Sequence, residues 1–239
     1  MTSPRRAAAA LLAAFALGGC GARQVSLIPV EADGYSARQI YDYFCEIAFE
    51  SEYGGARGFV CKWTKEIVVR VEGEFGEGET AVLDDLCARL GEIPGFPGIR
   101  YARPDEEANF TVHFVMQNEL SALFGDAAVT SSGMSRFYYG RESGEIRRAE
   151  AGIATNITPQ SAKASVICEE FLQSLGLAAD SYSYPESVFY EGYNVSLRPA
   201  AIDWAVLEVL YSEAISPRDD SETAAAAARR ILGITEDTP

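Results

Sequence analysis

The chain has 239 residues, with 35 Asp or Glu, 20 Lys or Arg and a single His, so its formal charge at pH 7 is -15. This charge argues against nucleic acid or an anionic membrane surface as a partner, because neutralising phosphates requires clustered Lys and Arg. One His excludes most zinc-enzyme chemistry, which uses several imidazole ligands. The hydrophobic fraction of 48% is that of a globular chain that buries a core.

The N-terminus has the organisation of an export signal. A basic pair that includes Arg5 is followed by an apolar run over residues 7–17 and by two Gly before Cys20. The run is shorter than the roughly 20 residues that span a bilayer. Small residues directly before a Cys resemble the lipobox of bacterial lipoproteins, in which that Cys becomes the lipidated first residue. We therefore expect a signal peptide at 1–19, a lipidated tether at 20–35 and, through the lipid on Cys20, attachment to a membrane on the periplasmic side of the bacterial cell envelope.

The remaining residues, 36–239, show the periodicities of helices and strands. Ser36 and Gln39 form a capping box that opens a helix, and apolar residues three and four positions apart continue it. Alternation of apolar and polar residues indicates strands. We expect helices over residues 36–48, 80–90, 159–175, 202–210 and 221–232, and strands over 67–71, 110–114, 135–139 and 144–155. This order, without internal repeats or a long linker, fits a single α+β domain.

Four cysteines follow the signal: Cys45, Cys61, Cys87 and Cys168. An even number of cysteines in an exported protein favours two disulfides over free thiols or metal ligands. Four cysteines allow three pairings, so the residues alone do not choose between them.

One segment resembles an enzyme motif. Laid on the metzincin pattern H-E-x-x-H-x-x-G-x-x-H, it keeps the Glu at Glu170 and the Gly at Gly176. Glu169, Gln173 and Ala179 stand where the three His would be. The order of a strand, a helix, strands with an edge strand and then this helix is also similar to that of the zincin peptidases. The resemblance implies a zincin-like mixed sheet with two long core helices plus C-terminal helices.

The chain from about residue 36 to 215 also resembles a family of bacterial lipoproteins known as domain of unknown function 2927. The resemblance rests on the Trp63 strand, Glu169-Glu170, residues 173–177, Asp180-Ser181, Ser187-Val188-Phe189, and Asp203 through Leu210-Tyr211. This family implies a fold and no activity. In the zincin arrangement the two long helices pack side by side, which implies that Cys87 pairs with Cys168 and leaves Cys45 for Cys61.

The motif lacks the ligands of zinc chemistry. In an H-E-x-x-H helix two imidazoles bind Zn²⁺, and the Glu takes a proton from the metal-bound water. Glu169 and Gln173 keep the spacing of the two histidines but offer a carboxylate and an amide, and Asp180 is the nearest further oxygen donor. We interpret Glu169 and Gln173 as polar residues at the edge of a half-buried helix; the alternative is that they bind a weakly held cation through oxygen ligands. Glu170 has no activated water. We therefore expect no metal, no cofactor and no catalytic residue, and we treat these four residues as a degenerate cleft.

Together these features predict a lipid-anchored cell-envelope protein whose catalytically inactive zincin-like domain binds a peptide or protein segment. In zincins an extended substrate adds to the edge strand above the active-site helix, which does not require the metal. One alternative is a hydrolase that uses Glu169, Glu170 or Asp180 in a non-standard site, and another is a structural envelope component without a specific ligand. The single His, His113 in mid-strand, is expected to be structural.

Overall fold

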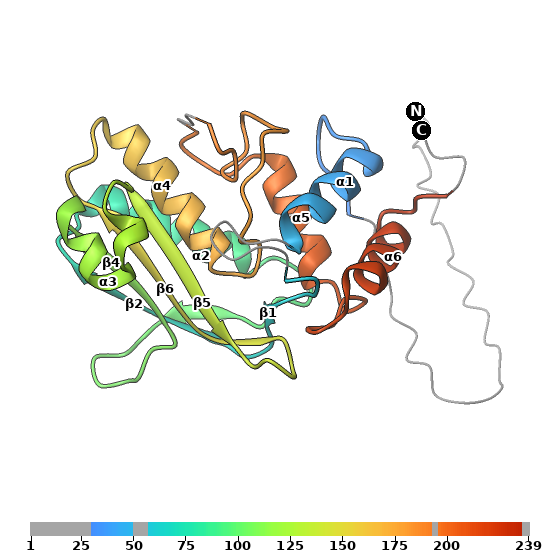
Figure 1. The fold of residues 1–239 in the computed structure, drawn as a ribbon, viewed down its shortest axis with the longest axis horizontal. Coiled ribbons are helices and arrows are strands. Elements are labelled where there is room, and N and C mark those ends of the chain that lie inside the picture. Colours follow the sequence, from blue (N-terminus) through green and yellow to red (C-terminus); the bar gives the residue numbers. More distant parts are fainter. Residues whose placement is uncertain (1–29, 50–56, 193–195, 236–239) are drawn as a thin grey trace, which may run out of the picture.

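The computed structural model describes residues 30–49, 57–192 and 196–235 (Figure 1). The predicted signal peptide, Cys20 and most of the tether lie outside these residues, so those features stay predictions. In the described part of the chain, no helix combines the length and the apolar character needed to cross a membrane.

A sheet forms the centre of the domain, and helices pack around it (Figure 1). The strands are β1 (Lys62–Trp63), β2 (Ile67–Gly73), β3 (Ile99–Tyr101), β4 (Phe110–Val115), β5 (Gly133–Tyr139) and β6 (Glu145–Ala154). The α-helices are α1 (Ala37–Ala48), α2 (Glu77–Leu90), α3 (Leu120–Phe124), α4 (Gln160–Gln173), α5 (Ala201–Tyr211) and α6 (Ser221–Ile231). Short 3-10 turns at Gln117–Glu119 and Asp126–Ala128 flank α3.

The sheet is mostly parallel. Its strands run in the order β1-β6-β4-β2-β3, and each of these neighbouring pairs is parallel. β5 is antiparallel to β6 and lies on the opposite side of β6 from β1 and β4. β5 and β3 are therefore the two outer strands of the described sheet. This architecture confirms the expected single α+β domain.

The two longest helices cover one face of the sheet. α2 and α4 each have 14 residues and pack against each other, and the Phe171 ring of α4 lies 4.8 Å from the Phe110 ring of β4. Leu83 and Leu86 on α2 are both 1% exposed in the same core. The opposite face carries a smaller apolar cluster beneath α3 that includes Leu120. α3 thus covers the part of this opposite face formed by β5 and β6.

The other three helices pack together beyond β1 (Figure 1). Lys62 of β1 is 7% exposed, and its Nζ donates to the carbonyls of Leu210, Ser212 and Ile215 at 3.0, 3.2 and 2.5 Å. The last carbonyls of a helix have no partner within the helix, so this ammonium group caps the C-terminus of α5. Burial lowers the pKa of Lys62 to about 8. Lys62 thereby joins the sheet to the helical end of the domain.

Most of the expected elements are present, with informative differences at their ends. α1 begins at the predicted capping box, in which Gln39 Oε1 accepts from the Ser36 N–H at 2.9 Å. α2 begins at Glu77 rather than Thr80, because the Glu79 carboxylate accepts from the Gly76 N–H at 3.0 Å and caps the earlier start. β1, β3 and α3 are not predicted by periodicity, because two, three and five residues are too few to show a repeat.

The predicted disulfides are wrong, since all four cysteines in the described chain are free thiols. α2 and α4 do pack together, but their cysteines face different neighbours. Cys168 of α4 lies beside Leu86 at a small cavity of about 110 Å³, whereas Cys87 of α2 contacts Tyr101 of β3. Packing of two helices therefore does not by itself bring these two sulfur atoms together.

The second expected pair is separated in a similar way. Cys45 of α1 is next to Tyr41; burial raises the pKa of its thiol, and the charge of Arg229 on α6 offsets part of this rise. Cys61 directly precedes β1 and lies close to Arg57. Burial raises the pKa of the Cys61 thiol to about 11 and that of Cys168 to about 12. These two thiols are protonated at neutral pH and are weak nucleophiles.

Candidate functional site

Two of the predicted cleft residues meet where α4 ends beside β5. Gln173, the last residue of α4, is 3% exposed. Its Nε2 donates to Asp180 Oδ1 at 2.7 Å, and its Oε1 accepts from Ser135 Oγ of β5 at 3.0 Å. We call Ser135, Gln173 and Asp180 the polar cross-link, because they tie β5 through α4 to the segment that follows α4. Sequence reasoning identified Gln173 and Asp180 but not their partner on β5.

The two adjacent glutamates of α4 take different positions. Glu170 is 7% exposed and lies against the start of β5, where a Cβ on Gly133 would come within 2.5 Å of Glu170 Oε1. Glu169 is half-buried, and neighbouring positions on a helix are rotated by about 100°. Among the residues that the structure describes, no three His, Cys, Asp or Glu side chains are grouped so as to hold a metal ion. Glu169, Glu170 and Asp180 therefore do not form a ligand set.

The turn that begins at Ser187 is held by a buried carboxylate. Asp203 of α5 is 0% exposed and accepts from Ser187 Oγ at 2.5 Å. It also accepts from the backbone N–H of Val188 at 3.1 Å and of Ala200 at 2.7 Å. Burial raises the pKa of Asp203 to about 6, while these three donors favour its charged form. Tyr43 of α1 reaches the same hydroxyl at 2.6 Å, so this group is a structural hub.

His113 lies away from the cleft. It alternates along β4 with Phe110, Val112 and Phe114, whose side chains face α2 and α4, so His113 points to the opposite face. Its Nδ1 is 3.5 Å from Glu72 Oε2 on β2. This position gives His113 no access to the polar cross-link.

β5 presents peptide groups at the margin of the sheet. The Ala154 N–H donates to the Ser132 carbonyl at 2.9 Å, which fixes the alternation of this antiparallel ladder. By that alternation Ser135 and Phe137 direct their N–H and C=O groups away from β6. In the described chain no further strand pairs with β5 on that side. The Arg57 guanidinium lies 5.0 Å from the centre of the Phe137 ring, so a cation stands beside this edge.

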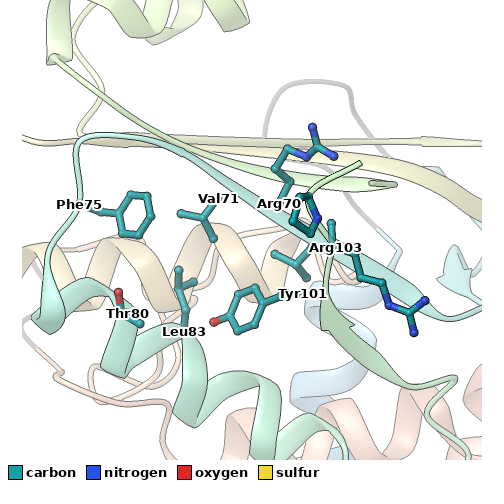
Figure 2. A pocket seen from close by; sticks show the side chains of 10 residues that line it. Arg70, Val71, Phe75, Thr80, Leu83, Tyr101 and Arg103 are labelled. Carbon is teal, nitrogen blue, oxygen red and sulfur yellow. The ribbon is translucent and has the colours of Figure 1, made fainter. Parts of the chain in front are cut away.

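A separate cavity of about 460 Å³ lies between β2, α2 and β3 (Figure 2). Val71, Phe75, Leu83 and Tyr101 supply apolar lining, and Arg70 and Arg103 lie away from Phe75 (Figure 2). The sequence analysis does not predict this cavity. The signal that was available is Phe75, an aromatic residue in an acidic Gly-rich turn that is 45% exposed in the structure.

The sequence matches the model of a known protein family. The sequence profile described as Protein of unknown function (DUF2927) matches residues 37–228. A comparison with curated proteins found no match. The matched range extends from the first residue of α1 into α6, so it contains the polar cross-link, the Asp203 hub and the cavity. The description of the family names no activity.

Proposed function

The chain belongs to the Protein of unknown function (DUF2927) family, and we propose that it is a lipid-anchored protein of the bacterial cell envelope that binds an extended peptide along β5 without cleaving it. The observation that carries this proposal is the polar cross-link. It stands beside an antiparallel outer strand, at the helix position where a zincin would hold its metal. Its side chains are engaged with one another rather than arranged around an ion.

The lipid anchor is supported by the sequence around Cys20. Acyl chains attach at this sulfur and at the new N-terminus, and multiple chains give stable anchoring where one is marginal. We expect wild-type protein to incorporate labelled fatty acid and to fractionate with membranes, and Cys20→Ala to do neither. Identical fractionation of the two proteins would contradict the anchor.

An inactive zincin-like domain accounts for the way α4 ends. Gly176 has φ +120°, and a Cβ there would come within 2.1 Å of the Cys61 carbonyl oxygen. The Gly of the motif therefore meets a packing requirement that does not depend on a metal. The histidine positions of the same motif hold Glu169, Gln173 and Ala179, of which Gln173 forms the polar cross-link. A zincin-like domain that kept its fold but lost its zinc ligands would keep the glycine and replace the histidines in this way.

Peptide binding at β5 is supported by the outward peptide groups of Ser135 and Phe137. An extended peptide that adds to a sheet edge gains affinity from main-chain hydrogen bonds and specificity from pockets for its side chains. The polar cross-link fixes the segment after α4 opposite this edge, and the cation of Arg57 lies at the Phe137 end. A peptide that pairs with β5 would therefore lie next to polar side chains.

The test uses proline to remove one outward N–H. Peptides selected from a random phage-displayed library on the protein from residue 20 onward are measured against Ser135→Pro and Ser135→Ala. Both variants lose the hydroxyl, but only proline removes the backbone donor, and proline is tolerated where the N–H faces away from the ladder. We expect Ser135→Pro to weaken binding at least about tenfold and Ser135→Ala less than about threefold.

Other outcomes favour the other functions. Equal affinities of the two variants would place the peptide elsewhere. Hydrolysis of a selected peptide that is abolished by Glu170→Gln would favour the hydrolase with a non-standard site. Failure to select any peptide would favour a structural envelope component.

A further inference from the structure

The second half of β2 has an open edge. β3 pairs with β2 only from Ile67 to Val69, and the last bond on that side runs from the Ala102 N–H to the Val69 carbonyl at 2.8 Å. Val68 instead exchanges bonds with Asn109 on the β4 side, which fixes the alternation of the strand. The N–H and C=O of Val71 therefore face the side on which β3 has ended. In the described chain no strand pairs with β2 there.

The space beside this open edge is the cavity of about 460 Å³ (Figure 2). Leu83 of α2, which is 1% exposed, and Val71 lie at its centre, with the rings of Phe75 and Tyr101 on either side of them. Phe75 and Tyr101 are 45% and 39% exposed, which is unusual for large apolar side chains that flank a cavity. A main-chain donor and acceptor thus adjoin an apolar surface.

Charge distinguishes one end of this cavity from the other. The neighbouring Arg100 is neutralised by Glu66 at 2.9 Å and by Glu106 at 2.6 Å. The Nη2 of Arg70 donates a hydrogen bond to the Glu106 carbonyl. Within the described residues neither Arg70 nor Arg103 forms an ion pair. Arg70 alternates along β2 with Val69 and Val71 and therefore points to the opposite face of the sheet, so Arg103 is the cation that lines this end of the cavity. In a chain of formal charge -15, an exposed guanidinium beside an apolar surface favours an anionic group at this end of the ligand.

We propose that this cavity is a second binding site, which takes an extended peptide segment with alternating apolar side chains and an acidic residue at one end. The segment adds to β2 at Val71 in line with β3, places its apolar side chains between Phe75 and Tyr101, and directs its carboxylate to Arg103. An apolar chain without a peptide backbone would leave the Val71 groups unused. The nearby N-terminus of α2 does not take the carboxylate, because Glu77 and Glu79 occupy its first turn.

This site is independent of the one proposed on β5, and the experiment separates them. The probes are two fluorescein-labelled hexapeptides, Val-Thr-Val-Thr-Glu-Glu and Glu-Glu-Val-Thr-Val-Thr, whose binding to the protein from residue 20 onward is followed by fluorescence anisotropy. Arg103→Glu reverses an exposed charge at the cavity, and Arg141→Glu is a matched control on an exposed arginine outside it. Val71→Pro removes the outward donor, and Ser135→Pro makes the equivalent change at β5.

We expect at least one probe to bind, with affinity reduced at least about tenfold by Arg103→Glu and by Val71→Pro, and within about twofold of wild type for Arg141→Glu and Ser135→Pro. Replacing both Glu of the probe by Lys should abolish binding. Absence of saturable binding of both probes up to 1 mM would overturn the proposal. So would binding that is indifferent to Arg103→Glu, which stays informative if Val71→Pro fails to fold. Loss of binding in Ser135→Pro alone would assign the probe to β5.

Discussion

β5 and the second half of β2 differ in how their polar groups are used. At β5 the side chains of the polar cross-link satisfy one another, and the buried Glu170 packs against Gly133. At β2 the peptide groups of Val71 face an apolar cavity that Arg103 also lines. Buried polar groups that are paired stabilise a fold, whereas those facing open space are available to a ligand. Side-chain changes in the polar cross-link should therefore act through stability, and changes of Arg103 at the cavity through binding.

The largest effect on stability is expected at the buried Asp203 carboxylate. Asp203→Ala leaves the Ser187 hydroxyl and two backbone donors without their buried acceptor, so the free energy of unfolding should fall by about 2–4 kcal/mol. Urea unfolding measures this change. The exposed Asp126→Ala serves as the matched control and should stay within about 0.5 kcal/mol of wild type. Equal stability of the two variants would show that Asp203 does not stabilise the turn that begins at Ser187.

The same carboxyl should give a pH dependence of definite sign. Its pKa is about 6 in the folded protein, against an ordinary value of 3.8 for an aspartate, so the folded state binds more protons between these pH values. Stability contributed by Asp203 is therefore fully present below pH 4 and is lost as pH rises through 6, by on the order of 2–3 kcal/mol. Comparison with Asp203→Asn isolates this term from the other carboxylates. A wild-type advantage that grows from pH 4 to pH 6.5 would contradict the assignment.

A smaller loss is expected from the polar cross-link itself. Gln173→Ala removes two hydrogen bonds at a buried position and should cost about 1–2 kcal/mol, whereas Ser135→Ala removes one of them and should cost about 1 kcal/mol or less. Thermal or urea unfolding of both variants measures the ranking. If Gln173→Ala were as stable as wild type, the amide would not hold β5 to the segment after α4.

The smallest effect on stability is expected at the cavity. Arg103 is exposed and forms no ion pair within the described residues, so Arg103→Glu should change the free energy of unfolding by about 0.5 kcal/mol or less. The same variant should lose the acidic probe. A destabilisation as large as that of Gln173→Ala would mean that Arg103 supports the fold, and that the cavity beside β2 does not differ from the polar cross-link at β5 in this respect.

Local signals in the sequence account for the elements that were predicted. Ser36 and Gln39 are three residues apart, and the alternation over 110–114 is complete within the strand, so each can be read without knowing the fold. β3 has three residues and owes its existence to pairing with β2, which leaves no periodic trace. The single α+β domain was therefore predictable, while the extent of its edges was not.

Sites depend on contacts that a sequence does not display. Ser135 and Gln173 are 38 residues apart, and only the packing of α4 on β5 brings them together. The cavity exists because β3 leaves β2 after Val69, a matter of register rather than residue type. The cysteine pairing failed for the same reason, since the rotation of each helix decides which neighbours Cys87 and Cys168 meet. The sequence alone does display that Glu169, Gln173 and Ala179 stand at the positions that the metzincin pattern gives to histidine.

The most direct test of the central claim is the zinc content of the purified wild-type chain grown in zinc-supplemented medium. Gln173 and its partners form a cross-link at a position that the metzincin pattern gives to a zinc ligand, and an amide between a hydroxyl and a carboxylate is a poor zinc site. Elemental analysis should therefore find far less than one zinc per chain. One equivalent of zinc per chain, together with chelator-sensitive peptide cleavage that Glu170→Gln abolishes, would contradict this expectation and identify the domain as an active metallopeptidase.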